Sequence, residues 1–289
     1  MSLAPDLRAR AETLGQALPA LLAEADHLAR TVMLGEHGRR RAGQGDEFWQ
    51  YRPAHAGDGA RSIDWRRSAR SDAHFVRERE WQAAQSVTLW VDRARSMGFS
   101  GAKDRPAKAD RAQLLALALA VLLLRGGERV GLAGGDAPKP GRAQVVTLAA
   151  RLEQPDPSDY GAPVAAGLVP HGRAVFLSDF LGPLEGLEKA LTEAAERGVT
   201  GLLLQVLDPA EEDFPFDGRT IFESMGGGLR HETQSAGELR SRYLARLAER
   251  KDRLQVLAGA VGWHYGCHHT GQPAQGGLLW AYRALEGGR

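Results

Sequence analysis

Three continuous apolar segments, each of a length suited to one strand, set the strongest limit on how this chain can fold. They are Ser86–Val91 (SVTLWV), Ala174–Leu177 (AVFL) and Gly201–Leu207 (GLLLQVL). A strand that lacks alternating polar residues is buried on both faces, which is typical of a parallel sheet covered by helices. Helical patterns over 109–125 and 184–197 separate the three segments. This order predicts an α/β fold with a Rossmann-like, mostly parallel sheet covered by helices.

The remaining patterns after residue 84 extend this arrangement. We expect further strands at 129–132, 144–148 and 263–268, and helices at 236–258 and 278–285. Two short segments, 220–223 and 229–232, flank the turn Gly226–Gly228 and predict a hairpin. The longest apolar run, 114–124, is too short to cross a bilayer, for which about 18 residues are needed, so we expect a buried helix and no membrane span.

The first 83 residues differ in composition. Residues 5–34 carry leucines at helical spacing, whereas 35–83 are rich in arginine, glycine and aromatic residues. Within 48–52, Phe48, Gln50 and Arg52 alternate with Trp49 and Tyr51, as in a strand. We therefore expect a helical segment at 1–34, a small β-rich subdomain at 35–83 and the α/β domain at 84–289.

Two acidic residues follow predicted strands of the parallel sheet. Asp92 comes after the strand ending at Val91, and Asp179 follows Ala174–Leu177 with one residue between. Ligands of open α/β sheets bind at the carboxyl ends of strands. With the hydroxyl of Ser96, these carboxylates are oxygen ligands of the kind that Mg²⁺ prefers, so the sequence raises a divalent-metal site as one hypothesis.

The residues around Asp92 also favour other interpretations. Ala94 has no ligand atom, and Arg93 and Arg95 place guanidinium groups beside the carboxylates. An arginine can pair with a carboxylate through two hydrogen bonds and so replace a metal ion. Three alternatives stay open: a bound divalent ion, a site that is empty or filled by arginine, and a carboxylate with a structural role.

The same residues resemble the metal-ion-dependent adhesion site of von Willebrand factor A domains. That site uses Asp-x-Ser-x-Ser after the first strand, a threonine on a middle loop and a later aspartate. Asp92, Ser96 and Asp179 match it; Ala94 departs from it, and Ser158 is a weak substitute for the threonine. The resemblance implies a degenerate site at which a partner protein binds.

A second resemblance rests on the arginine-rich segment. Three stretches resemble the signature of a bacterial family known as domain-of-unknown-function family fifty-eight. They are GQGDEF (43–48), YRP (51–53) and GDGARSIDWRRSAR (57–70). The matching signature residues are Gly57, Asp58, Arg61, Asp64, Trp65 and Arg70. The likeness continues through Val76–Glu80 into residues 89–97, although His55 stands near the usual tyrosine position.

Membership of that family would imply a von Willebrand factor A-like fold with a β-rich N-terminal element. Such proteins are associated with MoxR-type AAA+ ATPases and are expected to present client proteins to them. The alternating charges of the signature also have a simpler explanation. Asp58, Arg61 and Asp64 can form ion pairs with neighbouring charges, and such pairs can hold a small subdomain to a larger one.

Other chemistry has weaker support. The segment WHYGCHH (263–269) brings His264, Cys267, His268 and His269 close in sequence, but a structural zinc site needs four ligands at recognised spacings. No nucleophile motif surrounds Cys267, and no GxxxxGK[ST] phosphate loop occurs. The net charge of +1 and the mixed charges of the aromatic segment do not favour nucleic acid binding.

The sequence therefore predicts a non-enzymatic interaction module. It would act as an adaptor or co-chaperone that presents a client protein to a MoxR-type ATPase. The alternative is a divalent-metal-dependent hydrolase that uses Asp92 and Asp179. A single cysteine, Cys267, and an N-terminus without the apolar core of an export signal indicate the cytoplasm. No cofactor is expected other than Mg²⁺ under the metal hypothesis.

Overall fold

The computed structural model describes residues 21–32, 48–54, 63–69, 73–79, 84–228 and 230–286. These form two compact units. The helix at 21–32 belongs with the residues from 85 onward, and the described residues between 48 and 84 form the other unit.

The larger unit contains the predicted parallel sheet. Its five strands are β3 (Ser86–Val91), β4 (Arg129–Leu132), β5 (Arg173–Ser178), β6 (Thr200–Leu207) and β9 (His264–His269). They are arranged in the order β4-β3-β5-β6-β9, and every neighbouring pair is parallel. The α/β fold class predicted from the continuous apolar strands is confirmed.

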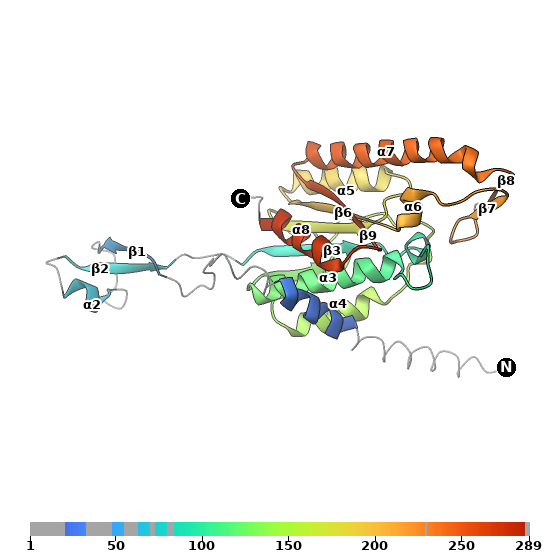
Figure 1. Cartoon of the computed structure of the whole chain (residues 1–289). Coiled ribbons are helices and arrows are strands. Elements are labelled where there is room, and N and C mark those ends of the chain that lie inside the picture. Colours follow the sequence, from blue (N-terminus) through green and yellow to red (C-terminus); the bar gives the residue numbers. More distant parts are fainter. Residues whose placement is uncertain are drawn as a thin grey trace, which may run out of the picture. The chain divides into compact units, whose positions relative to one another are not determined.

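Helices cover both faces of this sheet (Figure 1). One face carries α3 (Lys108–Arg125), α4 (Ala143–Leu152), α8 (Ala274–Glu286) and the helical residues 21–32; the other carries α5 (Glu185–Glu196) and α7 (Ala236–Ala260). Alternate strand residues enter the two cores: Val175 and Leu177 pack under α3, and Phe176 packs under α5 and α7. Because successive side chains face opposite sides of the sheet and both sides are covered, the strand sequences are apolar without interruption.

Two short elements follow β6 at its carboxyl end. The first is α6 (Pro209–Asp213), which begins with a capping box: the Asp208 side chain accepts a hydrogen bond from Ala210 N, and the Glu211 side chain accepts one from Asp208 N. The second is the hairpin of β7 (Thr220–Glu223) and β8 (Arg230–Thr233), which confirms the predicted hairpin. Phe214, Phe222 and Tyr243 stack together and hold β7 against α7.

One predicted strand is wrong. Residues 144–148 lie in α4, because the apolar spacing continues to Leu152: Val145, Leu148, Ala149 and Leu152 are buried at helical intervals. A window limited to 144–148 shows the β-branched pair Val145 and Val146 but misses this period. Among the helices that the structure describes, none combines the length and apolarity required to cross a membrane.

The smaller unit is built on one antiparallel pair. Strand β1 (Phe48–Pro53) pairs with β2 (Phe75–Arg79), and α2 (Trp65–Ser68) lies between them in sequence. Asp64 caps α2 by accepting a hydrogen bond from Arg67 N at 3.0 Å, and Asp64 N donates to Phe75 O at 2.8 Å. The described residues of this unit contain the two strands and one short helix, and the predicted domain bounds at 34 and 83 lie outside the described residues.

Candidate functional site

The carboxyl ends of β3 and β5 form the centre of the candidate site. The strand order reverses between them, since the chain continues from β3 to β4 on one side and from β5 to β6 on the other. A crevice outside the strand ends is expected at such a reversal. Asp92 and Asp179 each follow one of these two strands, and both are almost completely buried.

Asp92 accepts several hydrogen bonds. Its Oδ2 accepts from the Ser178 hydroxyl at 2.6 Å, and its Oδ1 accepts from Ala94 N at 2.9 Å. The backbone of Gly161 also hydrogen-bonds to this carboxyl, and it lies so close that a Cβ at position 161 would be 2.2 Å from Asp92 Oδ1. Burial is nevertheless the largest influence and raises the pKa of Asp92, with Asp179 acting in the same direction against the hydrogen bonds.

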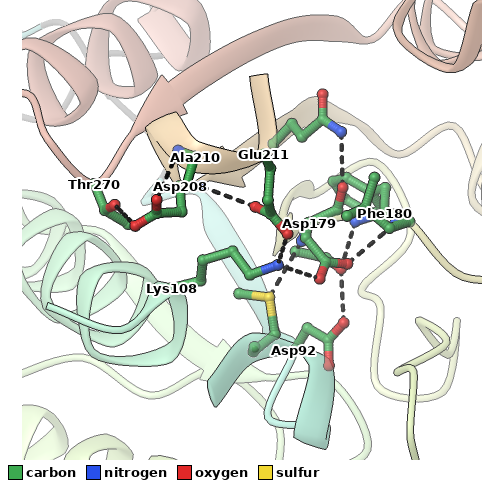
Figure 2. Close-up of polar contacts among 12 residues, drawn as sticks. Asp92, Lys108, Asp179, Phe180, Asp208, Ala210, Glu211 and Thr270 are labelled. Atoms are coloured by element: carbon green, nitrogen blue, oxygen red, sulfur yellow. Dashed lines mark hydrogen bonds and ion pairs between the residues drawn. The ribbon is translucent and has the colours of Figure 1, made fainter. Parts of the chain in front are cut away.

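Asp179 is paired with a lysine that sequence reasoning missed. Lys108 Nζ lies 2.8 Å from Asp179 Oδ2 and 2.6 Å from Glu211 Oε1, and Lys108 is 1% exposed (Figure 2). The ammonium also lies 5.6 Å from the centre of the Phe99 ring. We call Asp92, Lys108, Asp179 and Glu211 the strand-end cluster. It contains a buried ammonium with two carboxylate partners.

The electrostatics of Lys108 reflect this pairing. Burial alone would lower the pKa of the Lys108 ammonium, but the charges of Asp179 and Glu211 outweigh it, and the pKa is raised. The pKa of the Glu211 carboxyl is raised because burial outweighs the effect of the lysine. The two carboxylates therefore stabilise the charged form of Lys108.

Asp179 is fixed on its remaining sides by the sheet. Its Oδ1 accepts from Leu181 N at 3.0 Å, and its backbone carbonyl accepts from Gln205 Nε2 at 2.7 Å. Gln205 lies on β6 and in turn accepts from the Tyr265 hydroxyl of β9 at 2.6 Å. A polar chain thus runs across three neighbouring strands to the lysine.

The two predicted arginines do not supply the cation at this cluster. Arg93 Nη1 donates to the carbonyls of Arg151 and Gln154, at 2.7 and 2.9 Å. Arg95 is exposed and contacts the Gly226 carbonyl at 3.4 Å. The expectation that an arginine neutralises Asp179 is corrected: Lys108 performs this role, because it enters from the buried first turn of α3 whereas the loop after β3 points its arginines outward.

A divalent ion does not fit this donor set as it stands. Lys108 and Leu181 N bind the Asp179 carboxylate, and the Asp92 carboxylate accepts from Ser178 and Ala94. One observation favours an additional ligand: the buried hydroxyl of Ser96 has no hydrogen-bond partner in the described structure. Ser158, the weak substitute for a ligating threonine, donates instead to Asp156 at 2.6 Å. The metal hypothesis would require displacement of an ammonium.

Two loops and the hairpin tip meet above the cluster. Arg95 N and Ser96 N donate to the carbonyls of Ser158 and Asp159, both at 2.9 Å. A Cβ at Gly226 would overlap the Asp159 carboxylate, and Met225 lies beside Gly98. We call residues 93–98, 156–161 and 224–228 the strand-end surface; its exposed side chains include Arg95 and Met225.

The signature residues are only partly described. Asp64 serves as the cap of α2, and Trp65 is exposed with an edge contact to His74 at 5.5 Å between ring centres. Gly57, Asp58, Arg61 and Arg70 lie outside the described residues.

A signal for Lys108 was present in the sequence. The basic residues are nearly all arginine, and the lysines are confined to positions 103, 108, 139, 189 and 251. In the sequence, Lys108 stands directly before the predicted helix 109–125, which contains the longest apolar run of the chain. Glu211 gave no comparable signal, because it lies in an acidic run, EED.

Comparisons with known proteins identify a family. The family described as "Protein of unknown function DUF58" matches residues 50–253, which is more than half of the chain. Uncharacterized proteins of Mycobacterium bovis and Mycobacterium tuberculosis are 29% identical over 245 residues, covering 79% of this chain and 76% of theirs.

Two solved structures are also similar. One is described as conserved hypothetical protein BatB from Bacteroides thetaiotaomicron, with 16% identity, a TM-score of 0.40, and coverage of 71% of this chain and 98% of that chain. The other is described as an aerotolerance-related membrane protein from Bacteroides fragilis, with 16% identity, a TM-score of 0.42, and coverage of 71% and 100%. At these values neither contributes to the argument about function.

Proposed function

The chain belongs to the DUF58 family, and from that premise we propose that it is a non-enzymatic adaptor or co-chaperone acting with a MoxR-type AAA+ ATPase. The ATPase and its client enter this proposal through the family resemblance described above. In this proposal the protein works in the cytoplasm, where the ATPase has its nucleotide.

The observation that carries the proposal is the Lys108 ammonium between Asp179 and Glu211, at 2.8 and 2.6 Å. In a metal-dependent adhesion site an ion links loops at this edge of the sheet, and a partner carboxylate completes its coordination. Here the positive charge belongs to the chain. Because Lys108 is buried, a partner does not reach it. In this proposal its role is structural: it joins Asp179 and Glu211 at the edge of the sheet that carries the strand-end surface.

The strand-end surface has features that suit protein binding. Arg95 supplies an exposed guanidinium, and Met225 supplies an exposed flexible apolar side chain (51% exposed). Arginine and methionine are enriched at interfaces. An acidic residue of the partner pairing with Arg95 would make binding sensitive to salt but insensitive to chelators.

The test is a pull-down of a MoxR-type ATPase from the same organism on the immobilised full chain, with and without a chelator. We expect retention in both conditions and release at high salt. Arg95→Ala should weaken retention, whereas the matched control Arg253→Ala, on the exposed face of α7, should leave it unchanged.

Two results would count against the proposal. Loss of the ATPase on chelation would show that a metal ion links the partners. A hydrolytic activity of the purified chain that disappears in Asp92→Asn would support the metal-dependent hydrolase instead.

A further inference from the structure

A second cluster of metal-ligating side chains lies at β9, separate from the Lys108 cluster. Glu212 of α6 approaches Cys267 and His269 of β9, and their ligand atoms all lie within 4.8 Å of one another. We propose that Glu212, Cys267 and His269 form a binding site for a divalent transition metal ion of the Zn²⁺ class.

The strand geometry selects these residues from the histidine-rich segment. Successive side chains of a strand point to opposite faces, so Cys267 and His269 share one face of β9 and His264 and His268 share the other. His268 Nε2 is bonded to Arg111 at 3.0 Å on its own face. The four candidate ligands of this segment are therefore divided between the two faces, and the third ligand of the site is Glu212, which lies 55 residues before Cys267 in the chain.

The contacts within the cluster agree with the chemistry of zinc. Cys267 Sγ lies 3.9 Å from His269 Nε2, and the same nitrogen contacts Glu212 Oε2. Zinc binds thiolate, imidazole and carboxylate at about 2.0–2.3 Å in tetrahedral geometry. An ion between the three groups would need only small side-chain movements, and three protein ligands would leave the fourth position to water.

The site is accessible and its carboxylate is supported. The side chains of His269 and Glu212 are 20% and 29% exposed, which allows an ion to enter. Lys251 contacts Glu212 through Oε1, the oxygen that does not face His269. Metal binding can therefore use Oε2 while Lys251 keeps Oε1 and orients the carboxylate, as outer partners of ligating carboxylates do.

A catalytic cysteine explains the cluster less well. In a nucleophile–base–acid relay, the thiol and the carboxylate contact different nitrogens of the imidazole. Here both contact Nε2. Burial also raises the pKa of the Cys267 thiol, which disfavours a free thiolate. A bound cation would itself stabilise the thiolate, with release of one proton.

The experiment is a titration of the chelator-treated full chain with Co²⁺, followed by absorption, with Zn²⁺ competition. We expect one equivalent, a thiolate-to-cobalt charge-transfer band in the near ultraviolet and tetrahedral bands in the visible region, all removed by Zn²⁺. Cys267→Ser should abolish the charge-transfer band, and His269→Ala should weaken binding by about tenfold or more. The control His264→Ala, on the opposite face of β9, should bind as the wild type does.

Glu212→Gln provides a second variant with little change of volume; it should weaken binding and preserve the charge-transfer band. Absence of saturable binding in the wild type would overturn the proposal. So would a cobalt spectrum without the thiolate band, or affinity that is equal in the wild type, His269→Ala and Glu212→Gln. Because none of these readouts involves the ATPase, failure of this site and failure of the adaptor proposal are distinguishable.

Discussion

The ammonium of Lys108 lies 2.8 Å from the carboxylate of Asp179, although 71 residues separate them in the chain. Lys108 is in the first turn of α3, and Asp179 follows β5. Glu211 of α6 binds the same ammonium. The start of α3, the end of β5 and the start of α6 are thus joined at one edge of the sheet by a positive charge that belongs to the chain itself.

Replacing Lys108 tests how much this ion pair contributes to the free energy of unfolding. Lys108→Met leaves Asp179 and Glu211 as buried carboxylates without a counterion, and breaking a buried ion pair in this way costs about 3–5 kcal/mol. We expect a loss of that size in the free energy of unfolding, measured with urea near pH 7. The exposed Lys189→Met is the matched control and should change it by less than about 0.5 kcal/mol.

The origin of that loss can be separated from loss of packing. In the triple variant Lys108→Met, Asp179→Asn, Glu211→Gln, no charge is left without a partner, so we expect much of the stability to return. A single Lys108→Met variant as stable as the wild type would contradict the structural role of the ammonium.

Mg²⁺ should not bind at Asp92 and Asp179 of the wild type. Lys108 already binds Asp179, and an ion would have to displace it. Calorimetric titration with Mg²⁺, which prefers oxygen ligands to the thiol and imidazole of Cys267 and His269, should give no heat beyond the buffer control, in the wild type and in Asp179→Asn alike. A saturable heat that is present in the wild type and lost in Asp179→Asn would restore the metal hypothesis and give the buried Ser96 hydroxyl its missing partner.

Gly161 should be intolerant of a side chain. A Cβ there would lie 2.2 Å from Asp92 Oδ1, so Gly161→Ala must displace the carboxylate or the loop. We expect a loss of about 1–3 kcal/mol in the free energy of unfolding, as for other overpacked sites. Gly259→Ala, in α7 where an added Cβ meets nothing within 4 Å, should instead stabilise the protein by about 0.5–1 kcal/mol.

Equal effects of the two glycine substitutions would show that the strand-end loop is free to move. A loss confined to Gly161→Ala, together with weaker retention of the ATPase, would link the position of Asp92 to partner binding. Thermal unfolding of both variants followed by circular dichroism provides the comparison.

The fold could be predicted where local pattern and burial agree. The strands β3, β5 and β6 are buried on both faces, so their sequences are apolar and easily recognised. The hairpin was predictable because its turn, Gly226–Gly228, is a local sequence signal. The strand prediction for 144–148 was wrong because five residues are compatible with both the strand period and the helix period. Only Ala149 and Leu152 reveal the helix.

The site could be predicted only in part, because its contacts are long-range. Asp92 and Asp179 were found since each directly follows a strand signal, and parallel strands end at one edge. The partner of Asp179 depends on which helix packs there, and the sequence offered Arg93 and Arg95 because they are adjacent to Asp92. Similarly, Cys267 and His269 were visible as ligands, but Glu212 joins them only through the placement of α6.

His268 should make the stability of the protein depend on pH. Burial, assisted by the charge of Arg111, lowers the pKa of His268 from 6.5 to about 4. Arg111 has only donors, so its hydrogen bond at 3.0 Å requires an unprotonated Nε2. In the unfolded chain the imidazole takes up a proton below its ordinary pKa, whereas the folded chain does so only near pH 4. The stabilising contribution is therefore present above pH 6.5 and is lost as the pH falls toward 4.

The full contribution of this histidine to the free energy of unfolding is at most about 3–4 kcal/mol, at about 1.4 kcal/mol for each pH unit between the two pKa values. His268→Gln keeps an acceptor for Arg111 and removes the titration. Urea unfolding at pH values near 7, 5.5 and 4.5 should show a steeper loss of stability for the wild type than for His268→Gln, by roughly 2 kcal/mol over this range. The exposed His264→Gln serves as control, because its loss should parallel that of the wild type. Parallel curves for the wild type and His268→Gln would mean that the buried imidazole of His268 accepts its proton as readily in the folded chain as in the unfolded chain.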